Sequence, residues 1–191
     1  MKPWHLLSAL LTYPTSELRD AEEELRAAAS GDPGSARFLD WLCSVSLADA
    51  QLAYVETFDF DRRASLHLTY HSHGDSRQRG LALVRLKRRY GDAGFPLGGD
   101  ELPDYLPVLL EFAGLAGTAG EDVLNEHRAE IELIRTRLHD LESPYADLLD
   151  SLVGTLPRLR RDQLEAARKL AEEGPPSELV GLEPYPVGAS A

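Results

Sequence analysis

The stretch EDVLNEHRAEIELIRTRLH, residues 121–139, gives the clearest indication of the fold. Steps of four, four, three and four residues separate the members of its main stripe, Val123, His127, Ile131, Ile134 and Leu138. Such steps place side chains on one face of an α-helix, and polar residues fill most of the other positions. The stretch therefore predicts one amphipathic helix over residues 121–139.

Helical spacing continues on both sides of this stretch. No segment alternates apolar and polar residues over the length of a β-strand. Other predicted helices cover residues 6–13, 17–29, 38–45, 47–58, 67–73, 76–90, a stretch starting at 105, a stretch starting at 144, and residues 162–173. The sequence predicts an all-α fold with one compact helical domain, residues 1–173, and a flexible tail rich in Pro and Gly, residues 174–191.

Short polar residues and glycines mark the expected helix ends. Ser46 and Asp75 precede helical stretches and are expected to act as N-caps, as is Asp104 for a helix starting at residue 105. Gly74 and Gly91 follow helical stretches and are expected to end them.

The charge balance limits the kinds of partner. The chain has 32 acidic and 20 basic residues, a formal net charge of −12. Such a charge argues against nucleic acid or an anionic membrane as a general partner. A basic peptide fits it better.

Cysteine usage and targeting signals indicate a reducing compartment. Cys43 is the single cysteine, so the chain can form neither an internal disulfide nor a cysteine-based zinc site. The N-terminal stretch lacks the long apolar region and cleavage site of a signal peptide. No segment reaches the roughly 20 apolar residues of a membrane span, so we expect a cytoplasmic protein without direct membrane insertion.

Three histidines in SLHLTYHSHG, residues 65–74, raise the question of a metal site. Spacings of four and two cannot place His67, His71 and His73 on one face of a helix. A metal site would need Asp59 or Asp75 to fold back toward them. We therefore expect no metal and interpret the histidines as surface or capping residues, with a histidine-metal enzyme as the less favoured alternative.

Other catalytic patterns are missing from the sequence. Cys43 lies in an apolar stretch beside Trp41 and Leu42, which favours an inert thiol. The chain has neither a G-x-S-x-G nucleophile motif nor a phosphate-binding P-loop. We expect no enzyme activity and no cofactor.

Two segments combine aromatic and charged residues. They are YVETFDFDRRASLHL, residues 54–68, and DELPDYLPVLLEF, residues 100–112. An apolar groove with carboxylates at its rim would bind an apolar, basic peptide. A solvated acidic face over an ordinary core is the alternative interpretation, and a helical regulatory or scaffold protein that binds another basic peptide also remains open.

The same segments resemble a known family. YVETFDFDRRASLHLTYHSHGDSRQRG, residues 54–80, followed by ELPDYLPVLLEF, residues 101–112, is similar to the signature of the NarJ family, the nitrate reductase delta subunits. This family of assembly chaperones belongs to the wider TorD and DmsD group of molybdoenzyme chaperones. The resemblance extends from about residue 6 to residue 170.

The resemblance implies a cytoplasmic, all-helical chaperone that is not part of the finished enzyme. Its partner would be the N-terminal segment of the apo catalytic alpha subunit of nitrate reductase, kept competent for insertion of the molybdenum cofactor and an iron–sulfur cluster before membrane docking. Molybdenum cofactor biosynthesis proteins are possible further partners, whereas nucleic acid is not expected.

The resemblance also indicates candidate residues. Pro103 and Asp104 match the Pro-Asp-His triad of the TorD and DmsD branch, but Tyr105 replaces the histidine, so roles assigned to that histidine do not carry over. The resemblance implies that the histidines serve in packing and hydrogen bonding. The candidate peptide-binding residues are Tyr54, Phe58, Asp59, Arg62, His67, His71, Glu101, Asp104, Tyr105 and Glu111.

Overall fold

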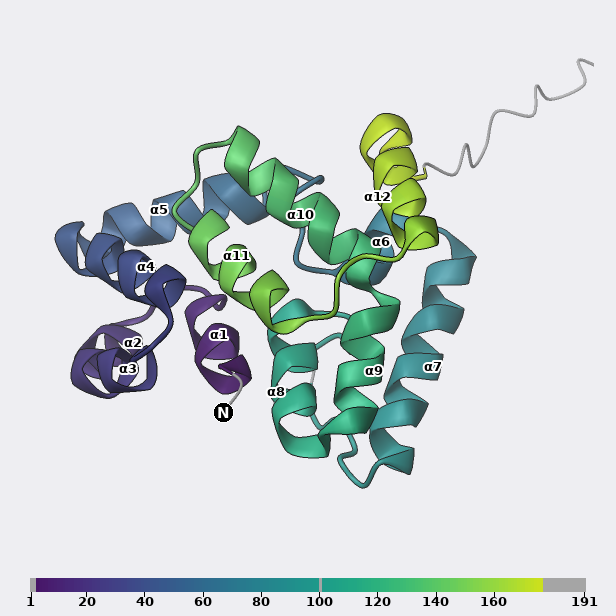
Figure 1. The fold of residues 1–191 in the computed structure, drawn as a ribbon, viewed down its shortest axis with the longest axis horizontal. Coiled ribbons are helices and arrows are strands. Elements are labelled where there is room, and N and C mark those ends of the chain that lie inside the picture. Colours follow the sequence, from purple (N-terminus) through teal and green to yellow (C-terminus); the bar gives the residue numbers. More distant parts are fainter. Residues whose placement is uncertain (1–2, 100, 177–191) are drawn as a thin grey trace, which may run out of the picture.

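The computed structural model describes residues 3–99 and 101–176. Within these ranges the chain forms twelve α-helices and no β-strand, which confirms the predicted all-α fold (Figure 1). The helices are α1 (Trp4–Leu10), α2 (Ser16–Asp20), α3 (Glu22–Ala28), α4 (Pro33–Ser44), α5 (Leu47–Phe58), α6 (Leu68–His73), α7 (Arg77–Asp92), α8 (Leu106–Ala116), α9 (Thr118–Glu126), α10 (Arg128–Asp140), α11 (Ala146–Thr155) and α12 (Arg161–Glu173). None of these helices is both long and apolar enough to cross a bilayer.

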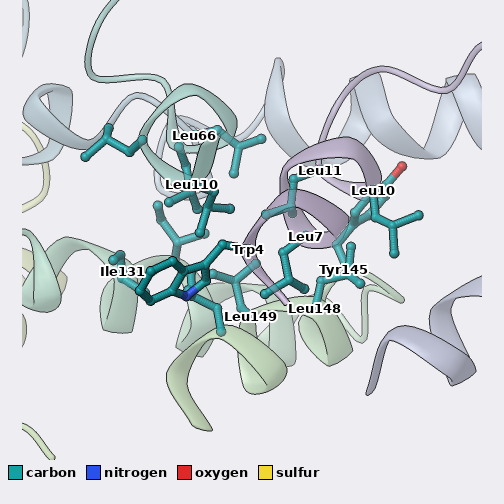
Figure 2. Packing of buried hydrophobic residues seen from close by; sticks show 14 of the residues in the cluster. Trp4, Leu7, Leu10, Leu11, Leu66, Leu110, Ile131, Tyr145, Leu148 and Leu149 are labelled. Atoms are coloured by element: carbon teal, nitrogen blue, oxygen red, sulfur yellow. The ribbon is translucent and has the colours of Figure 1, made fainter. Parts of the chain in front are cut away.

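Helix α1 lies in the middle of the hydrophobic core. It packs against α8 on one side and α11 on the other (Figure 1). Trp4 and Leu7 of α1 and its C-cap residue Leu11 are buried in the same core cluster as Leu110 of α8 and Leu149 of α11 (Figure 2). One core therefore joins the N-terminal helix to helices from the middle of the chain and from its C-terminal part.

An aromatic cluster joins α4, α5 and α11. Tyr145, just before α11, is fully buried, and its ring centroid lies 4.8 Å from that of Phe38 and 4.9 Å from that of Phe58. The ring centroids of Trp41 and Tyr54 lie 5.8 and 5.9 Å from that of Tyr145. Buried aromatic rings at these separations stabilise a core beyond the effect of their area alone.

Two of the predicted helix ends are confirmed. The Ser46 hydroxyl accepts a hydrogen bond from the backbone N–H of Asp49 at 3.1 Å and so caps α5. Gly74 follows α6 with a φ of 56°, a conformation that glycine adopts without steric cost.

The predicted bounds of α7 are wrong at both ends. Ser76, not Asp75, occupies the N-cap position, and the exposed carboxylate of Asp75 instead lies 3.9 Å from the guanidinium of Arg79. The helix also runs past Gly91 to Asp92, because a glycine in an exposed helix weakens it by only about 1 kcal/mol.

Two predicted helices are each divided. The predicted helix over residues 17–29 breaks at Ala21, and that over 121–139 breaks at His127, whose ψ is 21°. In the second case the halves pack on different partners: α9 lies against α8, whereas α10 lies against α11 and α12. Each half buries its own apolar face, so the chain has to change direction between them.

Two other helices start later than predicted. Tyr105, not Asp104, is the N-cap residue of α8, and Pro107 falls in the first turn, where its missing N–H costs nothing. Likewise Tyr145 precedes α11, which begins at Ala146. Asp104 is unable to cap α8 because its carboxylate is engaged elsewhere, as described below.

Only the first residues of the predicted tail are described. Pro176 packs closely on Gly74, since a Cβ atom on that glycine would lie 1.8 Å from the Pro176 carbonyl oxygen. Residues 177–191, the rest of the predicted tail, lie outside the described residues.

Candidate functional site

The two aromatic and charged segments meet in space. Leu68 donates its backbone N–H to the Asp104 carbonyl at 3.0 Å, and Leu106 donates to the Leu66 carbonyl at 2.9 Å. These bonds form an antiparallel bridge between His67 and Tyr105. We call residues 65–71 with residues 103–106 the signature junction.

A buried carboxylate holds the signature junction together. Asp104 is fully buried and accepts a hydrogen bond from the Thr69 hydroxyl at 2.5 Å. His67 Nδ1 lies 3.2 Å from Oδ1 of Asp104, and the Arg79 guanidinium lies 3.5 Å from Oδ2, the oxygen that Thr69 also contacts. Burial acts to raise the pKa of Asp104, but hydrogen bonds from His67 and Thr69 and the charge of Arg79 outweigh it and hold the pKa below its ordinary value. The carboxylate is therefore ionised and satisfied by its own chain.

Tyrosines connect the signature junction to its neighbours. The hydroxyls of Tyr54 and Tyr105 are hydrogen-bonded at 2.9 Å, and Tyr90 donates its hydroxyl to the Pro103 carbonyl at 2.6 Å. Burial raises the pKa of both Tyr54 and Tyr105. These phenols remain protonated and serve as hydrogen-bonding groups.

The three histidines have different surroundings. His71 is fully buried, which corrects the expectation of a surface or capping residue, and its Nε2 lies 2.8 Å from the Ser65 carbonyl oxygen. Burial lowers its pKa, which favours the neutral ring. His67 lies at the junction, and His73 is half-buried. Across residues 3–99 and 101–176, no group of three or more histidine, cysteine or acidic side chains is placed to hold a metal ion.

The candidate residues divide by burial. Those buried are Tyr54, Phe58, His71 and Asp104. Those half-buried are His67 and Tyr105, and those exposed are Asp59, Arg62, Glu101 and Glu111. The structure connects Tyr54, Tyr105, His67 and Asp104, in that order, through contacts between successive side chains. The four exposed residues lie at the surface.

Glu111 borders an apolar hollow of about 220 Å³, which we call the α8 hollow. Its apolar lining comes from α8, the end of α7 and the loop between them: Tyr90, Phe95, Leu97, Val108, Phe112 and Leu115. Leu115 is 58% exposed and Phe95 is 38% exposed. The apolar lining of the α8 hollow was not predicted from the sequence, although Val108, Phe112 and Leu115 follow helical spacing.

A second hollow, of about 500 Å³, is bordered by α6, α10 and α12, and we call it the α12 cavity. Ser72 and Glu130 lie on its wall, and the Ser72 hydroxyl donates a hydrogen bond to Glu130. No sequence motif indicated this cavity, because Ser72 and Glu130 are 58 positions apart.

Fold and site together define a small all-helical protein whose polar signature residues tie its own segments together and whose surface carries two hollows edged by carboxylates. The family model described as nitrate reductase delta subunit matches residues 15–150. The chain therefore belongs to the nitrate reductase delta subunit family.

The names of similar proteins also refer to nitrate reductase. A probable nitrate reductase molybdenum cofactor assembly chaperone, NarJ of Bacillus subtilis (strain 168), is 34% identical over 170 residues, which is 84% of this chain and 92% of that protein. The NarJ chaperone of Escherichia coli (strain K12) is 35% identical over 177 residues, covering 88% of this chain and 75% of that protein. The nitrate reductase-like protein NarX of Mycobacterium tuberculosis (strain ATCC 25618 / H37Rv) is 34% identical over 155 residues, or 80% of this chain, but only 24% of NarX. The family match and the two NarJ names, which describe assembly chaperones and not enzymes, support the expectation of a non-catalytic protein.

Proposed function

We propose that the protein is a cytoplasmic chaperone for the assembly of respiratory nitrate reductase. It binds the N-terminal segment of the apo catalytic alpha subunit and keeps the subunit open for insertion of the molybdenum cofactor and an iron–sulfur cluster before membrane docking. Molybdenum cofactor biosynthesis proteins are its further partners. The observation that carries the proposal is the similarity to proteins named as nitrate reductase assembly chaperones over 84% and 88% of this chain.

The α8 hollow supports a site for the peptide. Its lining is apolar, the Glu111 carboxylate stands at its edge, and the whole chain has a net charge of −12. A peptide side chain that is apolar and followed by a basic residue would bury the first in the hollow and place the second near Glu111. Leu115 and Phe95 are the apolar side chains with the most surface to lose on binding.

The buried candidates have a different part in this proposal. Because Phe58, His71 and Asp104 are buried, they contribute by holding α5, α6 and α8 in place. Tyr105 is half-buried at the start of α8 and is the junction residue nearest to a peptide-binding role.

Calorimetric titration tests the proposal. The purified protein is titrated with a peptide covering the N-terminal residues of the alpha subunit from the same organism, beside a scrambled peptide of equal charge. We expect selective binding of the native peptide. Equal binding of both would mean that the net charge alone explains the attraction.

Matched variants locate the site. Glu111→Lys should weaken binding about tenfold, whereas Glu23→Lys, the same charge change at an exposed position on α3, should change it less than about twofold. Leu115→Ser should also weaken binding, and Leu81→Ser, at a leucine of similar exposure on α7, should not. Equal losses in each pair would exclude the α8 hollow.

A further inference from the structure

The α12 cavity is an open hollow bordered by elements that are far apart in sequence. Helix α12 packs against α10, which in turn packs against α6 (Figure 1). The Gln163 side chain donates a hydrogen bond to the Asn125 carbonyl at 2.7 Å and so fastens α12 to the end of α9. Apolar parts of the lining come from Ala129, Ala166 and Leu170.

Most charged side chains along the α12 cavity already have an ionic partner. The pairs are Arg160 with Asp162, Lys169 with Glu173, and Glu126 with Arg89. Arg89 lies outside the lining, but it pairs with Glu126, so each of the three pairs is neutral.

Glu130 is the exception among the charged lining residues. It is only 8% exposed, and Ser72 donates a hydrogen bond to its Oε1 atom. The nearest ring nitrogen, His127 Nδ1, lies 3.9 Å from the same oxygen, which is too far for a hydrogen bond. Within the described ranges no lysine or arginine forms an ion pair with Glu130.

This arrangement leaves a buried negative charge next to open space. Buried carboxylates are normally paired with a cation, because an unpaired charge is costly to remove from water. Burial acts to raise the pKa of Glu130, but the neighbouring His127 and Ser72 outweigh it and keep the pKa below its ordinary value. Position three of α10 also favours the anion, since the helix N-terminus carries partial positive charge.

We propose that the α12 cavity binds the basic side chain of a partner peptide, with Glu130 as its counter-ion. A guanidinium or ammonium group reaches the Glu130 carboxylate, and its aliphatic stem lies along Ala129, Ala166 and Leu170. That this peptide is the nitrate reductase client rests on the function proposed above; the chemistry of the cavity does not.

A titration that needs no client tests the cavity directly. The probe is N-acetyl-arginine N-methylamide, with the citrulline analogue as its neutral counterpart of the same shape, and the readout is the backbone amide spectrum of the whole chain by NMR. We expect the arginine compound to shift the amides of Ser72, Ala129 and Ala166 in a saturable way and the citrulline compound to leave them unchanged. Equal shifts with both compounds, or shifts confined to other regions, would overturn the proposal.

Variants give an independent check. Glu130→Gln should weaken binding of the arginine compound about tenfold, while Glu172→Gln, an exposed carboxylate of α12 that does not line the cavity, should have no effect. Ser72→Ala keeps the charge and frees Oε1, so this variant should bind at least as well as the wild type. Unchanged binding in Glu130→Gln would rule out Glu130 as the counter-ion.

The two proposals fail in different ways. If the client peptide does not bind but the arginine compound does, the chaperone function is wrong and the cavity stands. If the client peptide binds and the arginine compound fails to shift the cavity amides, the cavity proposal is wrong and the function stands.

Discussion

Two buried carboxylates, Asp104 and Glu130, differ in how far the chain itself satisfies them. In the signature junction, Asp104 is contacted by Thr69, His67 and Arg79. At the α12 cavity, Glu130 has one hydroxyl donor, and its nearest basic group is the ring nitrogen of His127 at 3.9 Å, with no lysine or arginine paired to it among the described residues. The comparison separates two uses of a buried carboxylate. One whose hydrogen-bonding and ionic partners all come from its own chain stabilises the fold. One that borders a cavity and has no lysine or arginine partner is available to a ligand.

Removal of the Asp104 side chain should have the largest effect. Asp104→Ala leaves the Thr69 hydroxyl and the Arg79 charge without their buried partner, and we expect it to destabilise the fold by about 3 kcal/mol. Urea unfolding followed by circular dichroism measures the change. The exposed Glu111→Ala serves as control and should stay within about 0.5 kcal/mol. A loss below about 1 kcal/mol for Asp104→Ala would erase the contrast with Glu130.

The burial of His71 in the signature junction also predicts that the free energy of unfolding depends on pH. Burial lowers its pKa in the folded protein, so the unfolded chain takes up this proton first. The resulting stability is complete above the unfolded pKa of about 6.5 and is lost as pH falls toward the folded pKa, by up to about 1.4 kcal/mol per pH unit. When the free energy of unfolding from urea titrations is plotted against pH between 7.5 and 5, it should fall less steeply for His71→Gln than for the wild type. Equal slopes would mean that His71 is accessible to protons in the folded state.

A smaller loss is expected at the tyrosine pair. Tyr105→Phe removes the 2.9 Å hydrogen bond to Tyr54 and should cost about 1 kcal/mol in urea unfolding. Tyr54→Phe combined with Tyr105→Phe should cost less than the sum of the single changes, because both remove the same bond. Tyr13→Phe is the matched control at a 44% exposed ring and should be neutral. Strict additivity would show that the two hydroxyls do not interact.

The smallest effect on stability is expected at Glu130. Because no lysine or arginine of the described residues pairs with its buried charge, Glu130→Gln should change the free energy of unfolding by less than about 1 kcal/mol, and the change can be stabilising. The same urea experiment measures it beside Asp104→Ala. A loss as large as that at Asp104 would make Glu130 a structural residue and remove the physical basis of the ligand site.

Local sequence patterns predicted the helical fold and some of its ends. Ser46 and Gly74 act within one turn of themselves, so their neighbours in sequence were enough to assign them. The break at His127 could not be predicted, because the apolar spacing continues through it and only the different packing partners of α9 and α10 require a turn.

Burial within the candidate site depended on contacts between distant residues. The sequence indicated the right residue types at the signature junction, but the pairing of His67 with Tyr105 decides that Asp104 is buried and Glu111 is not. Glu130 gave no signal at all, since its position on a predicted helix says nothing about the cavity that α12 closes over it.

The bridge between His67 and Tyr105 also affects how the chain tolerates change. Its two backbone hydrogen bonds hold together the two ends of the segment that contains α7 and the glycine-containing turn after it. The segment is therefore a loop whose ends are fixed in space. Lengthening such a loop adds little closure entropy, about 0.6 kcal/mol for each doubling. A Cβ atom added to Gly98 would meet no other atom within 4 Å, so insertions near this residue need not disturb the core. Evolution can therefore vary the outer wall of the α8 hollow independently of the fold that supports it.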